Sequence, residues 1–130
     1  MLGELEEDGR IVVFDMEAGA GTLLRMEKDA ADVVLVVAEP SAKSIEVARR
    51  MADIGDERAR VIVLANKIRD DVELEAVRDV LGRHEVVVIP HDAGIERAER
   101  DGRAPIDVDA DGPGVAALRS LAERLVRDGR

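Results

Sequence analysis

The sequence predicts an α/β protein with a doubly wound, mainly parallel β-sheet sandwiched by helices. Two observations lead to this fold class. Four short apolar runs rich in Val, Ile and Leu recur along the chain, and segments with the apolar spacing of helices lie between the later ones. Runs that are apolar at nearly every position are typical of parallel strands buried on both faces, with helices as the right-handed crossovers.

The four apolar runs are the expected strands. Each is too short and too rich in β-branched residues for a helix, and each is followed by a polar or glycine-containing turn. The strands are predicted at Ile11–Phe14, Val33–Val37, Val61–Leu64 and Val86–Ile89.

Capping residues indicate where the helices begin and end. Ser41 is a predicted N-cap directly after Pro40, and Asp70 with Glu73 forms a capping box for the next helix, which Gly82 ends. A shorter helix is expected from about Asp92 to Asp101, stopped by Gly102, and a last one from Val115 to Leu125 after the breaker cluster Asp111-Gly112-Pro113-Gly114.

Composition limits the classes of function. The 130 residues, without repeats or linkers, are expected to form one domain over 1–130, large enough to bury a core. The net charge is −10 and Phe14 is the single aromatic residue, which argues against nucleic-acid binding. There is no cysteine, no apolar run of membrane-spanning length and no signal pattern, so we expect a cytoplasmic protein without a membrane partner.

Polar residues that follow the strands are the candidates for chemistry, because the carboxyl ends of parallel strands meet at one edge of the sheet. These candidates are Asp15-Met16-Glu17-Ala18-Gly19, Glu39-Pro40-Ser41, Asn66-Lys67 and Pro90-His91-Asp92.

Four of these motifs carry a family resemblance. DMEAG, VVAEPS followed by SIEVARRMADIG, NKIRDD and IPHD occur in an order that resembles the MinD/ParA-type deviant-Walker (SIMIBI) P-loop ATPases. The resemblance is greatest to the CooC-type accessory ATPases that insert nickel into carbon monoxide dehydrogenase. It covers nearly the whole chain and implies the C-terminal part of such an ATPase, a partial P-loop NTPase or Rossmann-like three-layer fold.

The resemblance also implies a nucleotide site for ATP or ADP with Mg²⁺. Asp15 would hold the metal through water, as a hard cation prefers, and the segment with Glu17 and Gly19 would sense the terminal phosphate. Asn66 would contact the edge of the adenine with Lys67 beside it, and the loop of Pro90, His91 and Asp92 would close over the base.

The sequence lacks three features that this family has. It contains no glycine-rich phosphate loop with its lysine, no second signature lysine and no metal-binding pair of cysteines. We therefore expect a truncated or split MinD/CooC-like nucleotide-binding domain, related to metallocentre maturation, which resembles an ATPase but does not hydrolyse ATP alone. The strand that leads into a phosphate loop would lie between Ile11–Phe14 and Val33–Val37. Its absence leaves three possibilities: the two flanking strands pair directly, a separate phosphate-loop half donates a strand, or two copies form a homodimer through the exposed edge. We expect a partner or self-association.

Other interpretations remain open at this point. The chain is alternatively a non-catalytic protein-interaction scaffold with a degenerate nucleotide fold, or a receiver-like domain in which Asp15 accepts a phosphoryl group. Asp15 alone is also consistent with a turn cap and Glu17 with a solvated acid. His84 and His91 are expected to be surface histidines, and Asp109–Gly112 a solvated turn rather than a calcium loop.

Overall fold

The centre of the fold is a parallel sheet. The structure, a computed structural model, describes residues 10–16 and 20–129. Within this part of the chain, three parallel strands form a sheet in the order β1-β2-β3. They are β1 (Val33–Ala38), β2 (Arg60–Ile68) and β3 (Glu85–Pro90). Three of the four predicted strands are thus confirmed, and β2 is longer at its carboxyl end than the apolar run suggested.

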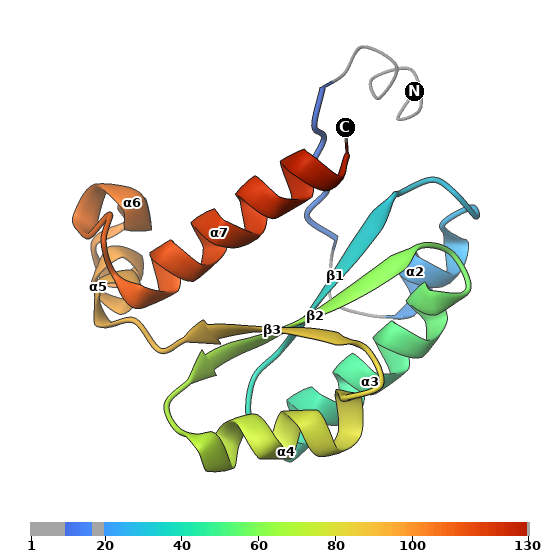
Figure 1. The fold of residues 1–130 in the computed structure, drawn as a ribbon, viewed down its shortest axis with the longest axis horizontal. Helices are drawn as coiled ribbons and strands as arrows, with labels where there is room; N and C mark the ends of the chain where they lie inside the picture. Colours follow the sequence, from blue (N-terminus) through green and yellow to red (C-terminus); the bar gives the residue numbers. More distant parts are fainter. Residues whose placement is uncertain (1–9, 17–19, 130) are drawn as a thin grey trace.

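Helices cover both faces of the sheet, which confirms the doubly wound α/β fold. Helices α3 and α4 lie on one face and α7 on the other, while α5 and α6 lie beyond the carboxyl end of β3 (Figure 1). The helices are α2 (Ala20–Arg25), α3 (Ala42–Asp56), α4 (Asp71–Leu81), α5 (Ala93–Asp101), α6 (Pro105–Val108) and α7 (Pro113–Asp128).

The predicted caps are present. The Oγ of Ser41 accepts a hydrogen bond from the backbone N–H of Ser44, and Oδ1 of Asp70 accepts one from that of Glu73 at 2.8 Å. Gly102 ends α5 in the left-handed conformation, with φ of 63°. These local signals depend on neighbouring residues alone, which is why the sequence predicts them well.

The predicted strand at Ile11–Phe14 is wrong. Residues 10–16 have no regular secondary structure and lie apart from the three strands (Figure 1). The side chains of Val13 and Phe14 are 86% and 62% exposed. An apolar run forms a strand only where a neighbouring strand accepts its backbone hydrogen bonds, and the described residues offer Ile11–Phe14 no such neighbour.

Two layers of apolar side chains form the core because successive residues of a strand point to opposite faces. One layer packs β1, β2, α3 and α4 together and includes Val36, Val63 and Val77. The other layer lies under α7 and consists of buried Ile62, Leu64, Ile89 and Leu121, with partly buried residues around them. The α7 layer is the smaller one, and it lies mainly over β2 and β3.

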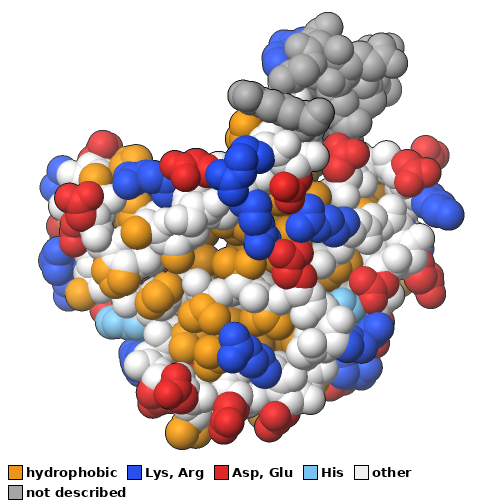
Figure 2. Space-filling model, viewed as in Figure 1, with side chains coloured by type: hydrophobic (Ala, Val, Ile, Leu, Met, Phe, Trp, Pro, Cys, Tyr) orange, Lys and Arg blue, Asp and Glu red, His pale blue; other side chains and the backbone are white. Residues whose placement is uncertain are grey.

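Charged side chains of both signs are interspersed over the face shown in Figure 2. Hydrophobic side chains gather near the centre of this face, with charged groups around them (Figure 2). Among the described residues, none of the helices combines the length and apolar character that crossing a membrane requires.

Candidate functional site

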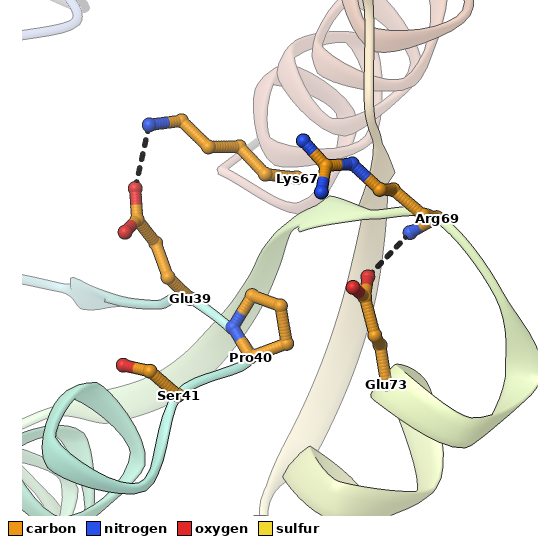
Figure 3. Close-up of a pocket in the computed structure, with 6 residues that line it drawn as sticks. All are labelled: Glu39, Pro40, Ser41, Lys67, Arg69 and Glu73. Carbon is orange, nitrogen blue, oxygen red and sulfur yellow. Dashed lines mark hydrogen bonds and ion pairs between the residues drawn. The ribbon is translucent and has the colours of Figure 1, made fainter.

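A cleft lies at the carboxyl edge of the sheet, where the sequence places its candidate residues. Its volume is about 230 Å³. It is formed by the end of β1, the end of β2 and the first turn of α4 (Figure 3). The lining residues are Glu39, Pro40, Ser41, Lys67, Arg69 and Glu73.

An ion pair spans the cleft. Nζ of Lys67 lies 2.7 Å from Oε1 of Glu39, so the ends of β2 and β1 are joined across this space (Figure 3). The hydrogen bond that Lys67 donates to the carboxylate of Glu39 raises the pKa of Lys67, which therefore stays charged. Both side chains are about half exposed, so water screens the pair and its net stabilisation is small.

Lys67 has an unusual backbone. Its φ is 59°, in the left-handed region that non-glycine residues rarely adopt, and the register between β2 and β3 shifts between Asn66 and Ile68. This bulge directs the side chain of Lys67 toward the end of β1. Backbone strain of this kind often accompanies functional sites, and here it is what brings the ammonium group into the cleft.

Asn66 has a side-chain amide that takes no part in holding the described fold together. It lies within β2, half-buried, paired in register with Ile89 of β3. Strand alternation places it on the α7 side of the sheet, since Leu64 belongs to the layer under α7. Its side-chain amide makes no hydrogen bond to any other described residue. One donor group and one acceptor group are therefore available at the edge of the sheet.

The loop after β3 lies beside the end of β2. The backbone N–H of His91 donates a hydrogen bond to the carbonyl oxygen of Ile68 at 2.9 Å, and Pro90 pairs in register with Ile68. Nε2 of His91 lies 2.9 Å from Oε1 of Glu96. The hydrogen bond from His91 lowers the pKa of Glu96. The structure thus brings Asn66, Pro90 and His91 together on adjacent strands.

Asp92 has a different environment from its neighbours in the sequence. It is 5% exposed, and its carboxylate accepts four backbone hydrogen bonds. Two come from the first turn of α5, from Gly94 at 2.8 Å and Ile95 at 3.3 Å. Two come from the first turn of α7, from Gly114 at 2.9 Å and Val115 at 3.3 Å.

Asp92 therefore caps two helices at once. Burial raises the pKa of Asp92, but the four backbone N–H groups more than offset it, and the pKa lies below its ordinary value. A Cβ at Gly112 or Gly114 would lie 2.4 Å or 2.9 Å from atoms of Asp92, so both glycines permit the close approach. Because both carboxylate oxygens accept hydrogen bonds, Asp92 holds the loop after β3 against α7. The predicted contact of Asp92 with a ligand stays a prediction.

Two lining residues were not among the predicted site residues. The backbone N–H of Arg69, one residue before the N-cap Asp70, donates to Oε2 of Glu73 at 2.7 Å, so Glu73 reaches back to the segment that enters α4. The side chain of Arg69 extends across the end of β2 in the direction of Lys67 (Figure 3). The signal that could have identified them is the helix start at Asp70, shortly after the NK pair, since an N-cap with a glutamate three residues later fixes a helix N-terminus at this edge.

The other predicted site residues are not assembled into this cleft. Asp15 is exposed and lies in the segment outside the sheet, away from the lining residues. Glu17 and Gly19 lie outside the described residues, so their predicted switch role is not described by the structure. In the part of the chain that the structure describes, no group of three or more His, Asp or Glu side chains is arranged to hold a metal ion.

The prediction that His84 is a surface histidine is wrong. Its side chain is 5% exposed, and Nδ1 lies 3.4 Å from Oδ1 of Asp56. That prediction rested on the lack of a recognisable set of zinc ligands, but the end of α3 packs over His84 and supplies Asp53 and Asp56 as neighbours.

Comparisons with known proteins find relatives that are described as ATP-binding. No protein-family model matches the chain. An uncharacterized ATP-binding protein of Methanocaldococcus jannaschii is 36% identical over 107 residues, a match that covers 77% of this chain and 40% of the relative. A second uncharacterized ATP-binding protein of the same organism is 26% identical over 90 residues, covering 68% of this chain and 36% of the relative.

A solved structure agrees in fold. The MinD cell division protein of Aquifex aeolicus superposes with a TM-score of 0.53 and 26% identity, covering 74% of this chain and 44% of that one. The chain thus spans less than half the length of the relatives it matches. It is homologous to part of these ATP-binding proteins, and its fold is that of part of MinD.

Proposed function

We propose that this chain is the adenine side of a MinD/ParA-type nucleotide-binding domain and that it binds ATP or ADP at the carboxyl edge of β2 and β3. One observation carries the proposal. The amide of Asn66, which has no hydrogen bond to other described residues, lies on the strand next to Pro90, and the loop of His91 follows directly. An amide in this position matches the paired donor and acceptor on the edge of adenine.

The neighbouring residues have supporting roles in this proposal. Lys67 and Arg69 supply positive charge at the cleft, and the stem of Lys67 offers an apolar surface to a base. His91 is positioned by its backbone hydrogen bond to Ile68 and by Glu96. Asp92 fixes the loop from behind, through the first turns of α5 and α7.

The phosphate side of the site is incomplete within these residues. The sequence has no glycine-rich loop with a lysine, and Glu39 and Glu73 place two acids in the cleft. Asp15 is exposed and outside the sheet, and the described residues contain no group of three or more candidate metal ligands. We propose that the chain binds nucleotide weakly and does not hydrolyse it without the missing elements.

A role in metallocentre maturation, as in the CooC-type ATPases, is a narrower form of this proposal. Its support is the order of the four sequence motifs from DMEAG to IPHD. No contact between the described residues adds to it. The chain has no cysteine, so a metal cargo would be held by other residues or by another protein.

A thermal-shift titration of the purified chain tests the proposal. Mg-ATP and Mg-ADP at millimolar concentration are expected to raise Tm, because a ligand that binds only the native state adds about 2.7 kcal/mol at a hundred times its Kd. Asn66→Ala should abolish the rise. Glu75→Ala on the exposed face of α4 is the matched control and should leave it unchanged.

Glu39→Gln provides a second readout of the same site. It removes a negative charge from the cleft and releases Lys67 from its ion pair, so it should strengthen nucleotide binding. The proposal is wrong if neither nucleotide raises Tm, or if Asn66→Ala retains the full shift. A protein-interaction scaffold then becomes the better description, since the exposed apolar side chains of β1 would still require a partner.

A further inference from the structure

The cations that line the cleft are already matched by acids. Two of the lining residues are cations, Lys67 and Arg69, and two are acids, Glu39 and Glu73. Nζ of Lys67 lies 2.7 Å from Oε1 of Glu39, so this ammonium group has its counter-ion within the cleft (Figure 3). The lining residues therefore present no excess of positive charge to a ligand.

Helix α5 adds negative charge to the same place. The pKa of Lys67 is raised first by the hydrogen bond to Glu39, and further by the negative charges of Glu99 and Glu96 on α5. Lys67 thus lies within reach of three carboxylates, one after the end of β1 and two on α5. Its charge is largely compensated before any ligand arrives.

The N-terminus of α4 is also compensated by acids. Asp70 is its N-cap, and Asp71 and Glu73 lie in its first turn. The side chain of Asp70 accepts the backbone N–H of Glu73, and the side chain of Glu73 accepts that of Arg69. Carboxylates in these positions offset the positive end of the helix dipole. A phosphate group that approaches α4 would meet them first.

We propose that this site selects the nucleoside part of its ligand, so that an adenosine with a neutral or cationic 5′ substituent binds more tightly than ADP or ATP. The inference rests on the proposed function for the position of the base, at Asn66. Lys67 follows Asn66 directly and lines the cleft, so the rest of the ligand extends along the carboxyl edge of the sheet into the cleft. The 5′ substituent then lies among the acids Glu39, Glu96 and Glu99.

The charge of the whole chain acts in the same direction. The net charge is −10, and a field of this sign repels polyphosphates before they reach the cleft. Salt screens the repulsion between exposed charges, with a Debye length of about 10 Å at 0.1 M. ATP should therefore bind more tightly as the salt concentration rises. A site that attracts phosphate through its own positive charge would show the opposite dependence.

A series of ligands that differ only in 5′ charge tests the inference. 5′-Amino-5′-deoxyadenosine, adenosine, AMP and ATP are titrated without Mg²⁺ into the purified chain, and Kd is measured from NMR chemical shifts. Affinity should fall in this order, by about tenfold from the amino compound to ATP at low salt. Raising NaCl from about 20 mM to about 200 mM should tighten ATP binding about threefold and leave adenosine unchanged.

Single-charge variants locate the effect. Glu39→Gln and Glu96→Gln each remove one carboxylate from the surroundings of Lys67, and each should reduce the ratio of the Kd for ATP to the Kd for adenosine. Glu123→Gln is the matched control. Glu123 is exposed on α7, beside Arg124, which pairs with Glu85 at the start of β3 and thus at the opposite edge of the sheet. This variant should leave the ratio unchanged.

The outcomes separate this inference from the proposed function. Equal affinities for all four ligands, affinity that rises from adenosine to ATP, or ATP binding that weakens with salt overturn the selection for the nucleoside and leave the nucleotide site in place. Binding of adenosine without any binding of ADP or ATP supports the selection and refutes the proposed binding of nucleotides. If none of the ligands binds, both proposals fail.

Discussion

The two edge strands of the sheet, β1 and β3, are alike in sequence and opposite in surroundings. Each has six residues, each is rich in valine, and each pairs with β2. None of the large hydrophobic side chains of β3 is exposed. Its last residue is Pro90, and Glu85 at its start forms ion pairs with Arg60 and Arg124. Two large hydrophobic side chains of β1 are exposed.

The difference shows which features allow an edge strand to remain without a partner strand. Proline and charged residues blunt the free edge of β3, and α7 covers the apolar face beside it. Helix α7 is held in place by Asp92, directly after β3. Strand β1 has neither charged residues nor proline within it. On its α7-side face Val33 packs against the α7 layer, but Leu35 and Val37 are exposed. An apolar edge of this kind indicates an interface rather than a finished surface.

The largest expected effect is the loss of the Asp92 carboxylate. Asp92→Ala leaves four backbone N–H groups without their acceptor and removes the caps of α5 and α7 together. We expect a loss of about 3 to 5 kcal/mol in the free energy of unfolding, because hydrogen bonds to charged groups and buried unsatisfied donors are both involved. Urea denaturation measures the loss.

Asp70→Ala is the control, since Asp70 caps α4 alone and is exposed. It should cost about 1 kcal/mol. Equal losses for the two variants would contradict the double cap and, with it, the explanation of why the β3 side is closed.

Low pH should weaken the stabilisation that the Asp92 carboxylate provides. The pKa of folded Asp92 lies below its ordinary value of 3.8, so the native state binds this proton less readily than the unfolded chain does. The contribution of Asp92 to stability is therefore complete above the unfolded-state pKa and is lost as the pH falls through the lower folded-state pKa. Asp92→Asn should flatten the loss of stability that urea denaturation measures as the pH falls from about 5 to about 2. Parallel limbs for the two proteins would refute the assignment.

A matched pair of valines tests the comparison directly. Val87 of β3 and Val37 of β1 occupy the same row on the same face, so the strand propensity lost on substitution is similar for both. Val87→Ala should cost about 1 kcal/mol, since it removes partly buried methyl groups under α7. Val37→Ala should cost less than about 0.5 kcal/mol in the chain alone. A large cost of Val37→Ala in the isolated chain would mean that β1 is already covered there.

Much of the fold was predictable because its signals are local. The apolar runs gave β1, β2 and β3, and short-range hydrogen bonds at Ser41 and Asp70 gave the starts of α3 and α4. The carboxyl-edge position of Asn66 and Lys67 also followed from the order of strand and turn. What the pattern did not reveal was that β2 continues through both residues and carries a bulge there.

The errors concern contacts between distant residues. Ile11–Phe14 reads as a strand, but the described residues hold no neighbouring strand for it. The cap that Asp92 provides for α7 was not predicted, because its partners Gly114 and Val115 are more than twenty residues away and left no pattern near it. His84 is buried because the end of α3 packs on it. Periodicity and spacing carry no information on such pairings.

The smallest expected effect concerns Lys67, which ties β2 to the open β1 side. Lys67→Ala and Lys67→Gly both remove the ion pair to Glu39, but only the glycine variant relieves the backbone at φ of 59°. Lys67→Gly should therefore be more stable than Lys67→Ala by roughly 0.5 to 1 kcal/mol, the left-handed penalty less the greater entropy of unfolded glycine. Thermal unfolding measures the difference. Because both variants lose the ammonium group from the cleft, they should lose nucleotide affinity equally, and a glycine variant that keeps its affinity would remove Lys67 from the proposed site.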